Sequence, residues 1–437
     1  MPFTDLDTTS VARFLSQIAD HQGDLADAFF ERRETSEVPP ADEAAGIRIW
    51  REEGFAIRLI REGGTWLASR DQIEPPLFAE ALRQVARVMP AAPYSPPTLR
   101  ISPFADSEVS PELVHFPRRV TRAIRRRLAG FPLRLQVRRH RRWVRVVGTQ
   151  LAPDQETEEF YSYEAEMPWG RHGALLAELD DQAVERVASS LTLLFRAHNA
   201  PAVQTGSRPV VLGPSACAVL LHEAVAHALE TDTLVLGGRI EAAIGVQIGS
   251  DLLHVLDNPA GAPGGVRRDT DDEGVRVVRR WLLRSGVVEQ LLADLFAAHH
   301  SADLMAGAGR RSHRHLPPVP RSSHLELLAG ESSFEELLTD VSDGLFFPEA
   351  ARGALDPLSG EFSLRLPGGR RIQDGVLAAG VGPCSLRGRV SDLLSGVTGV
   401  GNERELTGAG WCAKGGIKLP VWATAPALRL AAVEVVG

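Results

Sequence analysis

A carboxylate and two imidazoles stand inside an apolar stretch of this chain, and this feature constrains the fold more than any other. His222, Glu223 and His227 lie within residues 216–230, where nearly all other side chains are apolar. Burying these three groups without partners would cost several kcal/mol. The fold must therefore supply a metal ion or a dense network of hydrogen bonds at this point.

The residues before this stretch predict how it begins. Residues 209–212 are typical of a strand, and the Gly-Pro pair at 213–214 predicts a turn. Ser215 is then expected to be the N-cap of a helix that continues through residue 230. The three polar side chains are thus predicted to lie on one helix that directly follows a strand.

The spacing of the two histidines differs from the familiar His-Glu-x-x-His pattern, in which the ligands are four residues apart. His222 and His227 are separated by five positions, and such positions in a regular α-helix point about 140° away from each other. A π-bulge near residues 224–226 would bring both imidazoles to one side. In a regular helix Glu223 and His227 would share a face instead, and the set of ligands would have to change.

The composition indicates a soluble globular protein. The chain has 44% hydrophobic and 24% charged residues, and its net charge of -8 gives no basic footprint for nucleic acid. No segment approaches the roughly 20 apolar residues that cross a bilayer. The N-terminal residues lack the basic and apolar regions of a secretory signal. We therefore expect a cytoplasmic protein that binds neither nucleic acid nor membranes.

The three cysteines are too few and too widely separated to form a disulfide framework, which fits a reducing compartment. Cys217 and Cys384 are interpreted as small core residues, whereas Cys412 is a candidate metal ligand. Lys414 and Lys418 are the only lysines, so nearly all positive charge is arginine. This imbalance is interpreted as composition bias without functional weight.

The length predicts more than one domain, because a typical domain has about 150 residues. We expect an α+β protein with two domains, residues 1–200 and residues 201–437, joined near residues 199–207. The N-terminal domain is predicted to mix helices with an antiparallel meander. The C-terminal domain is predicted to be rich in β-strands and to contain the metal-binding helix.

Hydrophobic periodicity and turn residues predict the individual elements. Helices are expected over residues 10–31, 76–89 and 181–198, and the meander over 46–51, 55–61 and 65–69. In the second half, strands are expected over 275–283, 375–380, 415–421 and 428–436.

An arginine-rich segment precedes an acidic one in the first half. A dozen arginines lie between positions 118 and 145, and residues 154–166 are acidic. The favoured interpretation is a hairpin in which 133–147 pairs with 158–167, with arginines opposite glutamates. The alternative is a groove for an acidic ligand.

Beyond these motifs, the chain resembles the TldD/PmbA family of zinc metallopeptidases. The segment LLHEAVAHALETD is similar to the family's His-Glu-Ala-Val-Gly-His-x-Leu-Glu signature. Further segments match in the same order: DTDDEGVRV at 269–277, GAGRRSHRHLPPVPRSS at 307–323, GVGNERELTGAGWCAKGG at 399–416 and LPVWATAPALRL at 419–430. The first half matches more loosely, mainly through AGIRIWREEGFA at 45–56.

The resemblance implies a zinc ion held by His222, His227 and Cys412, because the catalytic family member takes its third ligand from a C-terminal cysteine. Three protein ligands would leave a fourth position for water, as in catalytic zinc sites. Glu223 would act as general base. The family's inactive subunit lacks the histidine motif, so this chain is expected to be catalytic and to hydrolyse unfolded or short peptides.

Three other positions are candidate functional residues, and each also has a purely structural interpretation. Glu230 is expected to orient an imidazole N–H, or else to be a surface glutamate at the helix end. Arg311 and His315 are candidates for binding substrate carbonyls or a terminal carboxylate, or else belong to a solvated loop. The acidic residues 271–273 are interpreted as a turn between two strands rather than as a second metal site.

The sequence departs from the family signature where small residues are usual. Ala226 and Ala228 replace glycines, and Thr231 stands where glycine is common. Alanine reaches unusual backbone angles less readily than glycine, so these changes put the local conformation in question. None of them removes a candidate ligand.

Two alternative functions stay open at this point. Cys412 could be a nucleophile with a histidine as its base. The chain could also be a non-catalytic subunit with a structural zinc in a two-subunit assembly. The resemblance implies a dimer, either a homodimer or a pair with a related inactive subunit.

Overall fold

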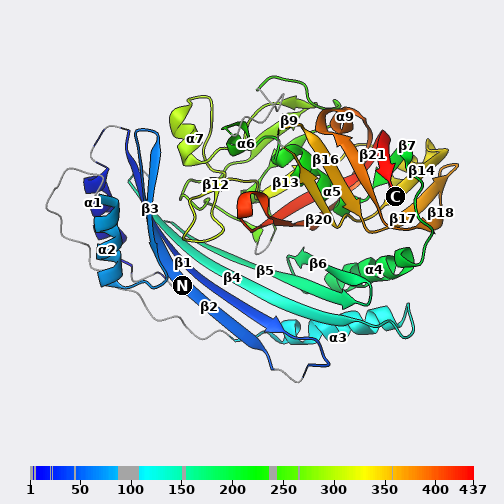
Figure 1. Cartoon of the computed structure of the whole chain (residues 1–437), viewed down its shortest axis with the longest axis horizontal. Helices are drawn as coiled ribbons and strands as arrows, with labels where there is room; N and C mark the ends of the chain where they lie inside the picture. Colours follow the sequence, from blue (N-terminus) through cyan, green and yellow to red (C-terminus); the bar gives the residue numbers. More distant parts are fainter. Residues whose placement is uncertain are drawn as a thin grey trace.

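The computed structural model describes residues 3, 6–19, 21, 23–43, 46–86, 108–149, 154–235, 244–263, 266–356 and 358–437. It mixes helices with two large sheets, which confirms the α+β class. A long curved sheet carries the N-terminal elements, and a more compact body of strands lies against its concave side (Figure 1). The expected division at residue 200 stays a prediction.

The N-terminal sheet is antiparallel and has the strand order β3-β2-β1-β4-β5-β6. Its strands are β1 (Leu25–Val38), β2 (Arg48–Arg61), β3 (Gly64–Arg70), β4 (Arg134–Gly148), β5 (Asp154–Met167) and β6 (Gly170–Leu176). Its helices are α1 (Thr8–Ile18), α2 (Pro75–Ala86), α3 (Pro111–Arg125) and α4 (Asp181–His198). One hydrophobic cluster joins α1 and α2 to one end of the sheet, and a second joins α3 and α4 to the other.

The second sheet contains 13 strands, and β21 runs through its middle between β13 and β7. Its strands are β7 (Gly206–Leu212), β8 (Val255–Asp257), β9 (Arg280–Arg284), β10 (Val287–Val288), β13 (His324–Leu327), β14 (Asp343–Phe347), β15 (Arg352–Leu355), β16 (Glu361–Leu366), β17 (Gly369–Gln373), β18 (Val376–Val381), β19 (Cys384–Arg389), β20 (Val397–Cys412) and β21 (Leu419–Val436). The short strands β11 (Gly309–Arg310) and β12 (Val319–Pro320) pair separately.

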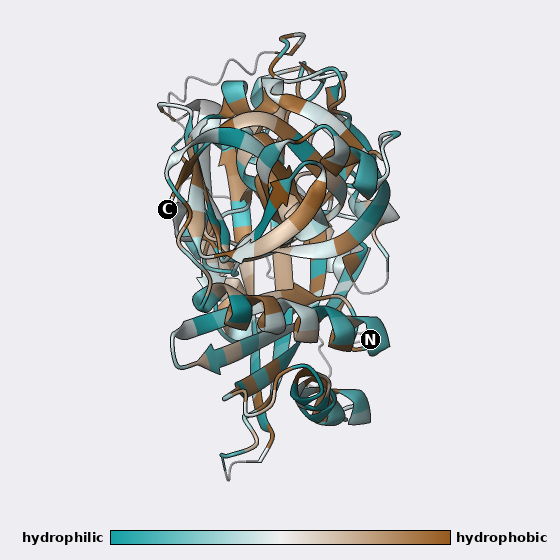
Figure 2. Cartoon of the chain, turned by 90° about the vertical axis from the view of Figure 1, so that its right-hand side faces the viewer, coloured by the Kyte–Doolittle hydropathy of each residue, from teal (hydrophilic) through white to brown (hydrophobic). Residues whose placement is uncertain are grey.

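Short helices complete the second half. They are α5 (Pro214–Leu220), the π-helix η1 (Leu221–Ala226), α6 (Thr231–Val235), α7 (Leu295–His300), α8 (Phe334–Thr339) and α9 (Val390–Ser395). The largest hydrophobic cluster surrounds α5 and the inner strands, where brown stretches gather in the upper body of Figure 2. In the described part of the chain, no helix combines the length and the apolar character that crossing a membrane requires.

Several predicted elements are confirmed. Helix α4 spans Asp181–His198, and the carboxylate of Asp180 accepts a hydrogen bond from the Ala183 backbone N–H, which caps the helix. Helix α2 begins one residue before the predicted range 76–89, whose last three residues fall outside the described ones. The arginine-rich segment forms the predicted hairpin, in which Arg141 lies opposite Glu159.

The predicted helix over residues 10–31 is too long. Helix α1 ends at Ile18, and Leu25 already begins β1. Because β1 is a central strand with both faces covered, most of its residues are buried and the alternating pattern of an exposed strand is missing. The apolar residues of a doubly buried strand therefore mimicked the spacing of a helix.

The predicted turn between residues 51 and 55 is also wrong, because β2 continues through Gly54. A Cβ atom at Gly54 would lie 2.2 Å from the backbone oxygen of Arg70 and 2.3 Å from Nε of Arg314. This glycine provides space for a close approach rather than a turn. The next turn, at Glu62 and Gly63, is real, and both residues have positive φ angles.

Strand predictions in the second half are partly right. The range 428–436 lies within β21, whereas only residues 419–421 of the range 415–421 belong to that strand. Of the range 275–283, only residues 280–283 belong to β9. Residues 271–273 form a tight loop, since Thr270 bridges to Arg276, as the turn interpretation expects.

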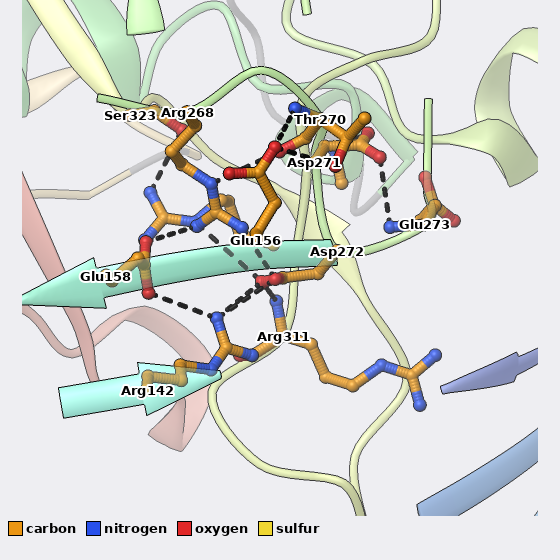
Figure 3. Close-up of polar contacts among 12 residues, drawn as sticks. Arg142, Glu156, Glu158, Arg268, Thr270, Asp271, Asp272, Glu273, Arg311 and Ser323 are labelled. Atoms are coloured by element: carbon orange, nitrogen blue, oxygen red, sulfur yellow. Dashed lines mark hydrogen bonds and ion pairs between the residues drawn. The ribbon is translucent and has the colours of Figure 1, made fainter. Parts of the chain in front are cut away.

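Buried ion pairs connect this loop to the N-terminal sheet (Figure 3). Arg142 of β4 donates to Asp272 Oδ1 at 2.9 Å and to Glu31 Oε1 at 2.7 Å. Arg268 bonds both Glu158 of β5 and Asp272, at 2.6 and 2.7 Å. Arg142 and Glu158 of the sheet thus join the two halves of the protein.

Replacing Arg142 with methionine should destabilise the protein by about 3–5 kcal/mol, because the buried carboxylates of Glu31 and Asp272 each lose one of their cations. Chemical denaturation measures this change. The matched control is Arg134→Met on the same strand, where the arginine is exposed, and its denaturation midpoint should stay close to that of the wild type. Equal midpoints for the two variants would contradict a structural role for the buried network.

Candidate metal centre

The helix that carries the two histidines begins two residues earlier than predicted. Gly213 is its N-cap and Pro214 its first residue, so the predicted cap at Ser215 is wrong. Proline suits this position because its missing N–H would have no helical partner there. Gly213 fits against Pro348, whose Cα would lie 2.9 Å from a Cβ atom at this position.

The predicted distortion of the helix is confirmed. Residues Leu221–Ala226 form a π-helix, and the backbone N–H of His227 donates to the carbonyl of His222, five residues earlier, at 3.2 Å. The wider turn places the two imidazole rings together, with their centroids 4.4 Å apart. A regular helix would have pointed them in different directions.

Cys412 completes the cluster from a distant part of the chain. One donor atom from each of His222, His227 and Cys412 lies within 4.8 Å of the other two. The sulfur is 3.6 Å from Nε2 of His227, and all three side chains are buried. The structure therefore brings together the three residues that the sequence suggested as ligands.

Strand pairing fixes the position of the cysteine. Cys412 is the last residue of β20 and lies opposite Leu419 of β21, next to a strand in the middle of the sheet. The preceding residue, Trp411, points to the other side and contacts the rings of His140 and Phe160 in the N-terminal sheet. The strand end is thus held from both faces.

These residues fit a metal ion. Both ring nitrogens of His222 are buried, and neither has a hydrogen-bond partner among the described residues. An unpartnered buried imidazole is costly unless a ligand binds it. Two imidazole nitrogens and one thiolate are a typical donor set for zinc, and three protein ligands leave a fourth position free.

The electrostatics of the two histidines differ. Burial, followed by the neighbouring His227, holds the pKa of His222 well below its ordinary value, so this imidazole is neutral and can donate its lone pair. Burial disfavours the charged form of His227 as well, but Glu230 and Cys412 outweigh it and raise its pKa to about 10. A metal ion would have to displace that proton.

Glu223 lies beside the cluster without joining it. Its Oε2 is 3.9 Å from Nε2 of His227, and its side chain keeps 15% of its surface exposed. Burial raises the pKa of this carboxyl group. A carboxylate in this position can exchange a proton with a molecule bound at the free coordination position.

Gly353 of β15 makes room for Glu223. A Cβ atom at Gly353 would lie 2.2 Å from Cγ of Glu223 and 3.0 Å from its Cδ. Nothing near this glycine in the sequence indicates that a distant glutamate packs against it, so its role becomes visible only in the folded structure.

Glu230 is completely buried and lies on the far side of His227. Its Oε2 is 2.9 Å from Nδ1 of His227, which leaves Nε2 directed toward Cys412. Burial alone would raise the pKa of Glu230, but His227 and Arg321 outweigh it and lower the pKa to about 2. The contact has the geometry of a carboxylate that orients an imidazole.

Arg311 and His315 interact with the N-terminal sheet instead. Arg311 is completely buried, with its guanidinium over the ring of Phe29 at 4.5 Å. His315 bonds Ser69 and Asp71, both at 2.7 Å. Arg311 is therefore suited to joining the two halves of the protein, and a role of either residue in substrate binding stays a prediction.

The alanines that replace family glycines fit the observed backbone. Ala226 ends the π-helix, and Ala226 and Ala228 are both buried. Among the described residues, the positive φ angles of non-glycine residues occur only at Glu62, Ser285 and Asp374. The turn around the histidines therefore needs no glycine.

The other two cysteines, Cys217 and Cys384, are free and buried as expected.

Comparison with known proteins places this arrangement in a family. Residues 205–437 match the family model described as PmbA/TldA metallopeptidase C-terminal domain. A protein of Methanothermobacter thermautotrophicus named "Metalloprotease" is 31% identical over 264 residues, which cover 60% of this chain and 57% of that protein. The "Metalloprotease TldD homolog" of Haemophilus influenzae is 32% identical over 242 residues, or 55% of this chain and 50% of the relative.

A solved structure shares the whole fold. The crystal structure of TldE from Thermococcus kodakarensis has a TM-score of 0.74 and 18% identity, and the match covers 98% of this chain and 99% of that one. The chain spans about half the length of the curated relatives that it matches. Because the family model covers more than half of its residues, the chain belongs to the TldD/PmbA family of metallopeptidases.

Proposed function

We propose that this protein is a zinc-dependent peptidase in which His222, His227 and Cys412 hold the metal and Glu223 is the general base. The observation that carries the proposal is the convergence of two buried imidazoles and one buried thiol beside a carboxylate. The two imidazoles lie at the π-helix, and the thiol lies at a strand end 185 residues after His227. The names of the relatives support a metallopeptidase.

In the proposed hydrolysis, the bound metal and Glu223 have different roles. A bound zinc ion would polarise the substrate carbonyl and lower the pKa of a water molecule to about 7. Glu223 would accept a proton from the attacking water and deliver it to the departing amine nitrogen, so that it returns to its carboxylate form. Its raised pKa suits this exchange, because the group takes up a proton more readily than an exposed glutamate.

The strand next to Glu223 indicates the class of substrate. Among the strands that the structure describes, β15 pairs with β16 alone, so one of its edges is unpaired. Gly353 of this strand lies against Glu223. We infer that an extended peptide pairs with this edge through its main chain, which favours unfolded or short peptides over folded proteins.

The other interpretations of the cluster are less well supported. A nucleophilic cysteine needs access to its substrate, whereas Cys412 is 3% exposed and lies against an imidazole that already contacts Glu230. A structural zinc is usually closed by four protein ligands, and among the described residues this cluster offers three. The cytoplasmic location and the pairing with a second or a related inactive subunit stay predictions.

Zinc should stabilise the folded protein through the three proposed ligands. At a zinc concentration roughly 1,000 times its dissociation constant, binding to the folded state alone adds about 4 kcal/mol. The melting temperature of chelator-treated protein should therefore rise when zinc is added. His222→Ala and Cys412→Ser should remove this rise, and Cys384→Ala, which changes a cysteine outside the cluster, should keep it.

Glu223→Gln tests the general base. The amide keeps the shape of the side chain but cannot take a proton, so peptide cleavage should fall by about 10²- to 10⁴-fold. Zinc content, measured on the same sample, should stay that of the wild type. Cleavage at the normal rate would rule out Glu223 as the base and support a non-catalytic role for the metal.

Gly353→Ala tests the contact between β15 and Glu223. The added methyl group must displace the glutamate side chain, so we expect cleavage to fall at least about tenfold, since catalysis is sensitive to displacements of about 1 Å. Zinc binding should persist. Gly380→Ala is the matched control, because a Cβ atom there meets its nearest neighbour at 3.8 Å. Equal activity in both variants would contradict the proposed position of Glu223.

A further inference from the structure

The two lysines of this chain occupy one turn. The sequence holds 48 lysines and arginines together, yet its lysines are Lys414 and Lys418 alone. Both follow Cys412 within six residues, in the connection between β20 and β21. Composition bias explains why lysine is rare elsewhere. It leaves open what these two lysines contact in the folded protein.

Lys414 is held by three oxygen atoms. Its Nζ donates to Oε2 of Glu230 at 2.6 Å, to Oδ1 of Asp232 at 2.8 Å and to the hydroxyl of Thr233. The side chain is 18% exposed. An ammonium group has three donors and three acceptors surround this one, so its hydrogen-bonding capacity is filled.

The same oxygen of Glu230 receives other donors. Oε2 lies 2.9 Å from Nδ1 of His227 and 3.3 Å from Nη1 of Arg321, whose side chain is buried. Arg321 also contacts Asp232 at 2.7 Å. Lysine and arginine can only donate, so the acceptor in this group is the carboxylate, and the imidazole nitrogen that meets it has to carry a hydrogen.

We propose that Lys414 is a positioning residue that fixes the ring of His227 for metal binding by anchoring Glu230. This inference rests on the proposed metal site. Lys414 ties Glu230 to the turn that also carries Cys412, so one short segment sets the positions of two proposed ligands. With a hydrogen kept on Nδ1 by Glu230, His227 would bind the metal through Nε2, which lies 3.6 Å from the sulfur of Cys412.

The geometry explains why arginine does not replace lysine here. Three acceptors converge on one nitrogen atom, and a compact ammonium group can meet all of them. The planar guanidinium spreads its donors over three nitrogens and needs more space. Lys418 has a different role, since its Nζ lies 4.6 Å from the centroid of the Trp411 ring, a contact that arginine makes equally well.

Lys414→Arg and Lys418→Arg form a matched pair that tests this proposal. Both keep the charge. Lys414→Arg should weaken zinc affinity by about 10- to 100-fold, the usual effect of losing the group that orients a ligand. Lys418→Arg should bind zinc within about twofold of the wild type. The affinity is measured on the full-length metal-free protein by competition with a coloured chelator, with zinc alone as the probe.

The absorption spectrum of the cobalt-substituted protein reports the geometry of the metal site, which a general loss of stability would not change. Cobalt bound to the wild type should show a thiolate charge-transfer band and the visible bands of a tetrahedral site. In Lys414→Arg the visible bands should shift, because the imidazole is no longer held in one orientation. An unchanged spectrum together with wild-type zinc affinity would overturn the proposal.

A third variant separates positioning from folding. Lys414→Ala leaves space for a small amine, so methylammonium at high concentration should restore zinc affinity by about tenfold or more, and no such gain should occur in Lys418→Ala. Failure of the amine to restore binding in a folded Lys414→Ala protein would count against the proposal. A wild-type protein that binds no zinc would contradict the proposed function itself.

Discussion

The close approach of two buried imidazoles determines the local structure at the centre of this protein. His222 and His227 are five residues apart, and a regular α-helix would separate their rings. The π-helix from Leu221 to Ala226 widens one turn of the helix. This irregular turn brings the centroids of the two rings to 4.4 Å from each other. The strand before the helix, the cysteine at the end of β20 and the glutamate behind His227 are all arranged around that turn.

A second set of buried charges holds the curved sheet against the body that carries this centre. Arginines of β2 and β4 reach carboxylates of the loop at residues 271–273, and Arg58 bonds Glu273 at 2.7 Å. Buried ion pairs are more directional than apolar contacts, so they define how the two halves fit. The sheet in turn contacts Trp411, the neighbour of Cys412. The orientation of the halves and the position of a proposed ligand are therefore linked.

Local patterns predicted much of this structure, and distant contacts account for what they missed. The capped helix at 181–198, the arginine–glutamate hairpin and the widened turn near residues 224–226 all follow from short segments. Strand β1 was mistaken for a helix because its burial depends on neighbours that are remote in sequence. Gly54 was taken for a turn because only the folded structure shows how closely Arg70 approaches. The roles inferred for Gly353 and Lys414 likewise depend on partners more than 100 residues away, which local periodicity cannot reveal.

The position of Cys412 also bears on when the centre can form during synthesis. The histidines lie near the middle of the chain, whereas the cysteine follows 185 residues after His227 and is held by a strand that ends at Val436. Strand β21 occupies the middle of its sheet, so the ribosome must release this strand before that sheet can close. A growing polypeptide, or a fragment from early termination, therefore carries two of the three donors and lacks a complete centre.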